Sequence, residues 1–285
     1  MTLLVSMRKN KTVSCKRKDV LNLNYKDYEE NEEDLINGFI KTYKLLVEMN
    51  IFSANDIPYT TQLIPLSVIC TLLGKEIENV TIKEKIKQWF WCGVFGELYG
   101  GANETRYAND VKQVYEWING KDELPKTIND CNFSTMRLIS LQTKNSAAYK
   151  GIMALILGNK CKDWINGSEM GLQTYLDERS DIHHIFPQNY SINMNIDKNR
   201  WNSIINKTPL YFSTNRYIGG NAPSEYISKI LKNKNISEED LKSFIETHMI
   251  NYELLKNNNF EAFFNNRAKS ILDKIEKATG KEITD

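Results

Sequence analysis

Hydrophobic residues recur at intervals of three and four along most of the chain, which is the period of an amphipathic α-helix. The clearest case is residues 31–50, where acidic residues occupy the expected first turn. Its regularly spaced apolar residues are Leu35, Phe39, Tyr43 and Leu46. The spacing predicts a helix that packs this side on a core. Further helices are predicted at 62–73, 83–99, 104–119, 134–142, 146–157, 224–231, 237–248 and 251–276.

Two regions depart from the helical pattern. Residues 1–30 have a short apolar start followed by polar runs of both signs, so we expect a loosely ordered segment or an arm onto a partner. Residues 180–220 contain two short apolar runs of strand type, with a helix expected between them at 197–205. The fold class predicted is mainly α, with a small strand-containing insert embedded in further helices.

The first of these apolar runs contains two of the three histidines of the chain, His183 and His184. Ile182 precedes them and Ile185-Phe186-Pro187 follows. Alternation along a strand sends adjacent side chains to opposite faces, so one imidazole can hold a metal ion while the other points at a substrate.

Two asparagines follow the histidines, nine residues apart. Asn206 precedes the second predicted strand, Leu210-Tyr211-Phe212, and Asn215 lies just after it. Ser213-Thr214 is expected to cap a short helix that carries Asn215. The order is therefore a strand with two histidines, a loop, a strand, and a helix with an asparagine.

Charge restricts any nucleic-acid surface to a local patch, because the net charge of the chain is only +1. One basic cluster comprises Arg8, Lys9, Lys11, Lys16, Arg17 and Lys18, and it equally fits a solvated, mobile segment. A second comprises Lys198, Arg200, Lys207 and Arg216. The second cluster is the better candidate for phosphate contact, because it surrounds the histidine and asparagine positions.

The five cysteines are scattered and include no Cys-x-x-Cys pair, which argues against a zinc knuckle. Their arrangement fits a reducing compartment. The sequence has no apolar run of membrane-spanning length and no signal-peptide core, so we expect a cytoplasmic protein without a membrane segment.

Several motifs together resemble a known nuclease. They are His183-His184-Ile185-Phe186-Pro187, Asn206-Lys207-Thr208-Pro209-Leu210, Thr214-Asn215-Arg216 and Ala222-Pro223-Ser224-Glu225-Tyr226-Ile227. They resemble the HNH nuclease finger at the C-terminus of GmrSD-type restriction proteins. The helical part is similar to the same family at Gln88-Trp89-Phe90-Trp91, Phe95-Gly96-Glu97-Leu98-Tyr99, Ala147-Ala148-Tyr149-Lys150 and Met153-Ala154-Leu155. The resemblance covers roughly residues 55–270.

The resemblance implies a ββα-metal (HNH) finger that hydrolyses DNA as an endonuclease or nickase in bacterial restriction or phage defence. The domains expected are an N-terminal arm with the first helix at 1–50, a helical domain at 51–176, and an HNH nuclease domain with C-terminal helices at 177–285. Residues 1–50 are also a candidate partner-docking element.

The resemblance also assigns the site residues. His184 is the expected general base, with its second nitrogen oriented by a backbone carbonyl. His183 and Asn215 are the expected ligands of one Mg²⁺ or Mn²⁺. Asn206 is counted with the catalytic group, although in the family it holds the finger loop. The remaining assignments are Arg216 as a catalytic phosphate contact, Asp181 as a supporting carboxylate, and Lys198, Arg200 and Lys207 as nucleic-acid-binding residues.

One family feature is missing from the sequence. Neither an Asp-Gly-Gln-Gln-Arg type motif nor a phosphate-binding glycine loop occurs, so the ParB/sulfiredoxin-like regulatory domain is expected to be absent. We therefore expect half of a split system, with that domain as a separate subunit, or a truncated relative or free-standing nuclease. A homodimer is also possible, because a single finger cuts one strand.

Two other readings of the sequence stay open. The protein can be a non-catalytic DNA- or partner-binding subunit that keeps the finger without turnover. It can also be a purely helical scaffold in which the adjacent histidines have no chemical role. Metal-dependent DNA cleavage distinguishes a nuclease from the non-catalytic subunit. Affinity for a metal ion excludes the helical scaffold.

Overall fold

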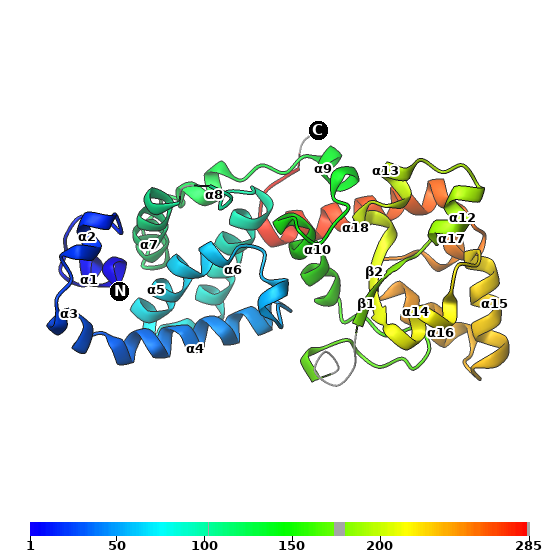
Figure 1. Ribbon diagram of the computed structural model, residues 1–285, viewed down its shortest axis with the longest axis horizontal. Helices are drawn as coiled ribbons and strands as arrows, with labels where there is room; N and C mark the ends of the chain where they lie inside the picture. The colour runs from blue at the N-terminus through cyan, green and yellow to red at the C-terminus, as the bar shows by residue number, and fades with distance from the viewer. Residues whose placement is uncertain (102, 174–179, 284–285) are drawn as a thin grey trace. The chain divides into compact units, whose positions relative to one another are not determined.

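The computed structural model describes residues 1–101, 103–173 and 180–283. The chain divides into two compact units (Figure 1). The N-terminal unit comprises Met1–Phe133 with Ala278–Lys281, and the C-terminal unit comprises Ser134–Lys277 with the residues that follow Lys281. The domain boundary predicted between residues 176 and 177 lies outside the described residues. None of the described helices has the length and apolar character needed to cross a membrane.

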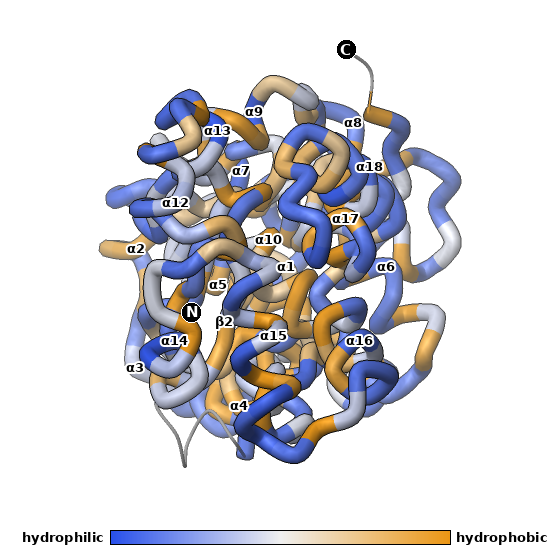
Figure 2. The backbone as a smooth tube through the Cα atoms, turned by 90° about the vertical axis from the view of Figure 1, so that its right-hand side faces the viewer, coloured by the Kyte–Doolittle hydropathy of each residue, from blue (hydrophilic) through white to orange (hydrophobic). Residues whose placement is uncertain are grey.

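The N-terminal unit is helical throughout its described secondary structure. Its α-helices are α1 (Thr2–Arg8), α2 (Arg17–Leu21), α3 (Tyr25–Glu29), α4 (Glu32–Glu48), α5 (Leu63–Leu73), α6 (Val80–Phe95), α7 (Glu104–Ile118) and α8 (Lys126–Asp130). Short 3-10 helices lie at Ala54–Asp56, Thr60–Gln62 and Gly74–Glu78. Figure 2 shows α5 as one of the more hydrophobic segments, and most of its residues are buried. Helices α4, α7 and α1 pack against it.

The helix predicted at 31–50 is confirmed, but its regularly spaced apolar residues divide between the core, where Leu46 is buried, and the surface. Phe39 and Tyr43 are 53% and 56% exposed, whereas Gly38 and Thr42 are buried. A Cβ atom added at Gly38 would lie 2.9 Å from the Ser67 carbonyl oxygen of α5, so only glycine permits this close approach. Tight packing of α4 on α5 therefore selects the side with small residues and leaves the aromatic side in solvent.

The expectation that residues 1–30 are loosely ordered is wrong, whereas a contact of this segment with a partner stays a prediction. The residues fold into α1, α2 and α3, and Leu3 and Leu4 of α1 are buried. Arg8 forms an ion pair of 2.6 Å with Asp34, and Lys9 pairs with Asp27. The short apolar start is sufficient to bury α1 against α5 and α7.

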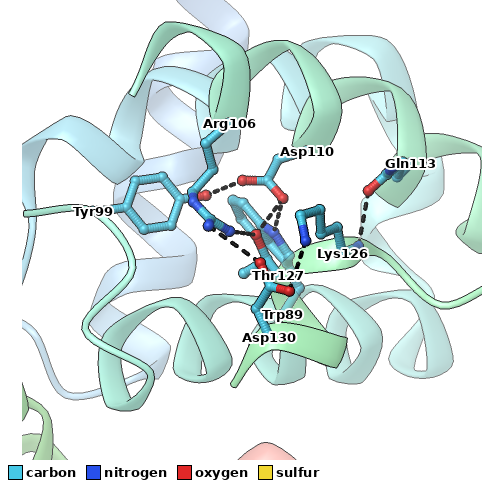
Figure 3. Close-up of polar contacts among 8 residues, drawn as sticks. All are labelled: Trp89, Tyr99, Arg106, Asp110, Gln113, Lys126, Thr127 and Asp130. Atoms are coloured by element: carbon cyan, nitrogen blue, oxygen red, sulfur yellow. Dashed lines mark hydrogen bonds and ion pairs between the residues drawn. The ribbon is translucent and has the colours of Figure 1, made fainter. Parts of the chain in front are cut away.

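A buried carboxylate joins three helices of the N-terminal unit (Figure 3). Asp110 of α7 is 1% exposed and accepts hydrogen bonds from Trp89 Nε1 of α6 at 3.1 Å and Thr127 Oγ1 of α8 at 2.6 Å. The Tyr99 hydroxyl donates a further bond to Asp110, and Arg106 donates to Thr127 Oγ1 at 2.9 Å. Burial raises the pKa of Asp110. Because the carboxylate oxygens are engaged by these donors, the network has a structural role.

The C-terminal unit contains the only sheet of the described residues. Its elements are α9 (Thr135–Ser140), α10 (Ala147–Leu157), β1 (Ser180–His184), α12 (Gln188–Asn193), α13 (Lys198–Trp201), a 3-10 helix (Ile204–Asn206), β2 (Lys207–Tyr211), α14 (Phe212–Ile218), α15 (Pro223–Asn233), α16 (Glu238–Glu246), α17 (Tyr252–Lys256) and α18 (Phe260–Thr279), whose last residues belong to the N-terminal unit. The described residues are thus mainly helical with one small two-stranded sheet. This confirms the prediction of a mainly α fold with a small strand-containing insert.

The two strands pair antiparallel, from Ser180 opposite Tyr211 to His184 opposite Lys207. The second strand begins three residues before the predicted Leu210, and Phe212 already belongs to α14. In place of one inserted helix at 197–205, the chain forms α13 and then a 3-10 turn. Because β2 ends at Tyr211 and α14 begins at Phe212, the strand and the helix follow each other directly.

Helix α18 anchors the start of β2 through a buried arginine. Arg267 is fully buried, and its guanidinium donates to the carbonyl oxygens of Ile205, Lys207 at 2.8 Å and His248 at 3.3 Å. Burial lowers the pKa of Arg267 to about 9. Phe186, just after β1, packs on Phe263 of the same helix with ring centroids 4.9 Å apart. These contacts fix both strands on one helix.

His248 lies just after α16, at the end of the helix predicted at 237–248. Its ring is fully buried, its Nε2 donates to the Lys162 carbonyl oxygen at 2.8 Å, and its Nδ1 accepts from the Thr208 hydroxyl at 2.6 Å. Burial lowers the pKa of His248 to about 3. The imidazole is therefore neutral at neutral pH and connects β2 to the loop that contains Lys162.

Candidate functional site

The sheet and α14 bring two of the predicted site residues together. Helix α14 follows β2 without a loop and packs against both strands. As a result, His183 Nδ1 of β1 and Asn215 Oδ1 of α14 lie 2.7 Å apart. Asp181 projects from the same side of β1 as His183, and its Oδ2 accepts a hydrogen bond from Asn215 Nδ2 at 2.8 Å. The three side chains form one chain of contacts.

These contacts define the protonation of His183. Because the Asn215 amide nitrogen donates to Asp181, the amide oxygen faces His183 and accepts from its Nδ1–H. The lone pair then resides on Nε2, which is buried and has no hydrogen-bond partner among the described residues. Burial lowers the pKa of His183 to about 4, against the opposing effect of the Asn215 hydrogen bond. The ring is neutral at neutral pH, as a metal ligand must be.

Two aromatic rings that stack on each other pack against the imidazole of His183. Trp164 and Tyr226 make edge contacts with it, at centroid distances of 5.5 and 6.1 Å. The Tyr226 hydroxyl donates to the Ile185 carbonyl oxygen at 3.0 Å, which ties α15 to the chain just after β1. The sequence analysis gave neither residue a role at the site, although Tyr226 belongs to one of the motifs of the resemblance.

Asp163 holds the beginning of α14, and it was also missed. Its carboxylate is fully buried and accepts hydrogen bonds from the Tyr211 backbone N–H at 3.1 Å and the Thr214 hydroxyl at 2.7 Å. The predicted capping by Ser213-Thr214 is wrong in this respect, because α14 has Tyr211 at its N-cap and Thr214 donates to Asp163. A carboxylate from a distant loop thus performs the capping function.

His184 lies on the other side of β1, as strand alternation predicts. Its ring is partly buried, and Nε2 contacts Asn202 Oδ1 at 3.2 Å. Asn202 Nδ2 in turn donates to Gln142 Oε1 at 3.3 Å. His184 Nε2 therefore donates to an amide oxygen rather than to the expected backbone carbonyl, and Nδ1 is the nitrogen with a lone pair. Burial lowers the pKa of His184, which keeps this nitrogen unprotonated at neutral pH.

Asn206 is a structural residue in this arrangement. Its side chain is fully buried, with Oδ1 accepting from the Phe186 backbone N–H at 2.8 Å. Its Nδ2 donates to the carbonyl oxygens of Phe186 at 2.9 Å and Trp201 at 2.8 Å. Both amide hydrogens are used, so the grouping of Asn206 with the catalytic residues is corrected. The loop-holding role implied by the family matches these contacts.

The four basic residues near the site differ in their surroundings. Lys198 and Arg216 are exposed, and the Arg216 guanidinium lies 5.5 Å from the Phe212 ring centroid. Arg200 forms a two-point ion pair with Glu261, at 2.6 and 2.8 Å. Lys207 is 5% exposed and donates to the Gln142 carbonyl oxygen at 2.6 Å, and burial lowers the pKa of Lys207 to about 8. Arg200 and Lys207 are thus engaged within the protein, and their assignment to phosphate contact stays a prediction.

The donor set fits one divalent ion only if an amide oxygen takes part. Among the described residues, no three His, Cys, Asp or Glu side chains gather into a metal-binding group. His183 Nδ1 and Asn215 Oδ1 lie 2.7 Å apart, and two ligands at right angles with bonds of about 2.1 Å lie about 3 Å apart. The pair suits neighbouring positions around one cation if the proton of His183 moves to Nε2, because the Nδ1 lone pair is then free to face the ion beside Asn215 Oδ1. Asp181 supplies the outer carboxylate that fixes the amide.

Comparison with known proteins gives one similarity and no functional assignment. No protein-family model matches the chain. The chain is similar to an uncharacterized protein of Methanocaldococcus jannaschii, with 28% identity over 264 residues, which cover 82% of this chain and 44% of the relative. The chain thus spans less than half the length of this archaeal relative.

Proposed function

We propose that this protein is a metal-dependent DNA endonuclease or nickase, in which β1, β2 and α14 form a ββα-metal finger of the HNH type. The observation that carries the proposal is the approach of His183 and Asn215 to 2.7 Å from elements 32 residues apart in sequence. His184, on the opposite side of β1, supplies the general base that hydrolysis requires. A role in bacterial restriction or phage defence rests on the resemblance alone.

In this proposal His183 and Asn215 would hold the metal ion, and Asp181 keeps the amide oxygen directed at His183. When bound, Mg²⁺ or Mn²⁺ would supply positive charge next to the phosphate and the leaving 3′ oxygen. An uncharged imidazole among the ligands favours Mn²⁺ over Mg²⁺, because Mg²⁺ prefers oxygen ligands.

Proton transfer falls to His184. Its Nε2–H is held by Asn202, so Nδ1 is available to accept a proton from the attacking water. The depressed pKa of His184 keeps the base unprotonated at neutral pH, at some cost in basicity. Arg216 is exposed on the turn of α14 next to Asn215 and is the side chain proposed to contact a phosphate.

The second candidate is a non-catalytic DNA- or partner-binding subunit of a split restriction system. The internal engagement of Arg200 and Lys207 favours it, because half of the predicted basic cluster is not available to DNA. This candidate keeps the finger and binds nucleic acid or a separate ParB/sulfiredoxin-like subunit without turnover.

Conversion of supercoiled plasmid tests the nuclease proposal. The wild type is incubated with Mn²⁺, Mg²⁺, Co²⁺ or EDTA, beside His184→Ala and the control Gln188→Ala, an exposed residue just beyond the same segment. Nicking that requires the metal, persists in the control and is lost in His184→Ala supports the proposal. DNA binding without cleavage under every metal supports the second candidate instead.

A further inference from the structure

Helix α4 exposes a continuous apolar stripe on the side opposite its contact with α5. The stripe consists of Ile36, Phe39, Ile40 and Tyr43, which are 56%, 53%, 48% and 56% exposed. Their spacing of three and four places them on one face, as in helices that pack against another helix. Single exposed apolar residues are common on protein surfaces, but a stripe of large ones marks an interaction surface.

Charged residues of opposite sign flank the two ends of the stripe. Glu33 lies before it and Lys44 after it, and both are exposed. They are eleven residues apart, which is close to three helical turns, so they project from the same flank of α4. Their midpoint falls within one residue of the midpoint of the stripe, between Phe39 and Ile40.

This pattern is self-complementary only for antiparallel helices. When two copies of α4 cross with opposite directions, residues on the same flank meet, and Glu33 of each copy lies beside Lys44 of the other. A parallel pairing instead brings together the acidic first turns of both copies, which contain Glu32, Glu33 and Asp34. Like charges at that distance repel and disfavour the parallel arrangement.

We propose that the protein forms a homodimer in which α4 packs antiparallel against α4 of a second copy. The contact is isologous, so each favourable charge pair occurs twice. A hollow of about 260 Å³ adjoins the stripe, where Leu35 and Phe39 of α4 and Ile64 line it together with α1 residues. It provides a place for an apolar side chain of the second copy and extends the interface beyond a single helix pair.

The inference is independent of the nuclease proposal, because it concerns a surface of the N-terminal unit and no site residue. It also accounts for the exposure of part of the hydrophobic pattern of α4. Two of the residues that follow the helical period, Phe39 and Tyr43, are among those that face the second copy.

Sedimentation equilibrium of the full chain tests the proposal at about 1–100 µM protein, a range that resolves micromolar dissociation constants. We expect a concentration-dependent dimer for the wild type and a monomer for the double substitution Ile36→Glu/Ile40→Glu. Met136→Glu serves as the control, because Met136 is a large apolar residue, 70% exposed, outside the stripe. Circular dichroism verifies that each variant keeps its helical content.

Charge reversal tests the direction of the helices. Lys44→Glu is expected to weaken the dimer about tenfold, because two exposed ion pairs are each replaced by repulsion. The double variant Glu33→Lys/Lys44→Glu restores the pairs and the wild-type affinity. A monomeric wild type across the whole range overturns the proposal, as does a dimer that persists in Ile36→Glu/Ile40→Glu. Failure of the double reversal to restore affinity overturns the antiparallel arrangement.

Discussion

Replacement of Asn206 by alanine is expected to destabilise the C-terminal unit while leaving the site chemistry intact. The substitution removes three hydrogen bonds to backbone groups. The Phe186 carbonyl oxygen keeps a bond of 3.3 Å from the Ser191 hydroxyl, so the groups left without the Asn206 partner are the Phe186 N–H and the Trp201 carbonyl. An unpaired buried polar group costs about 1–3 kcal/mol, which gives a total of about 2–6 kcal/mol.

This loss is large relative to the total stability of a domain, which is about 5–15 kcal/mol. Urea unfolding monitored by tryptophan fluorescence measures it, because Trp164 and Trp201 are buried in the C-terminal unit. Asn257→Ala is the matched control. Asn257 is an exposed asparagine with one bond to the Glu253 carbonyl oxygen, and we expect its removal to change stability by less than about 0.5 kcal/mol.

A catalytic role for Asn206 predicts a different result. If Asn206→Ala unfolds at the same urea concentration as the control but cleaves no DNA, the structural account of this residue is refuted. The structural account predicts instead that activity per folded molecule stays within a few-fold of the wild type at low temperature. His184→Ala, in contrast, is expected to remain folded and to lose activity.

Three further outcomes follow from the contacts described above. Asp181→Ala is expected to weaken Mn²⁺ binding by about 10–100-fold in calorimetric titrations, because the Asn215 amide loses its outer partner; unchanged affinity contradicts this role. The pKa of His248 lies at about 3 when folded, below the usual 6.5, so its contribution to stability is present above pH 6.5 and is lost as pH falls from there towards 3. Between pH 6.5 and 5 the loss is about 2 kcal/mol, and His248→Gln is expected to show a correspondingly weaker pH dependence of its urea midpoint. Arg200→Ala is expected to lower stability without changing the salt dependence of DNA binding, whereas Lys198→Ala reduces that dependence; a reversed pattern contradicts the ion pair with Glu261.

Local patterns were sufficient for part of the site. The alternation of side chains along a strand correctly separated His183 from His184, because this period is a property of the backbone itself. The strand before Asn215 and the helix that contains it were also predictable from short-range signals. The approach of His183 to Asn215 was implied only by the resemblance, since it depends on the pairing of β1 with β2, which are distant in sequence.

The supporting residues were not predictable, because their partners are distant in sequence. Asp163 caps α14 from 48 residues before Tyr211, and no local motif marks such a carboxylate. The pairing of Arg200 with Glu261 spans 61 residues, so its basic character alone suggested a phosphate contact. The contact of Lys207 with the Gln142 carbonyl was not predictable for the same reason, since Gln142 lies 65 residues before it.

Helix α4 shows a different limit of sequence patterns. The apolar period correctly located the helix, because periodicity depends only on the chain. It could not identify the buried side, because apolar residues occur on two faces and the choice depends on how closely α5 approaches. The glycine at position 38, which permits that approach, was the available signal.

Metal binding tests the central claim most directly, because it examines the His183–Asn215 pair without requiring turnover. Titration with Mn²⁺, followed by electron paramagnetic resonance of the free ion, measures stoichiometry and affinity for the wild type, His183→Ala, Asn215→Ala and His184→Ala. The account predicts one ion per chain, with binding lost in His183→Ala and Asn215→Ala and retained in His184→Ala. A wild type that binds no Mn²⁺, or binding that survives the loss of His183, contradicts the account.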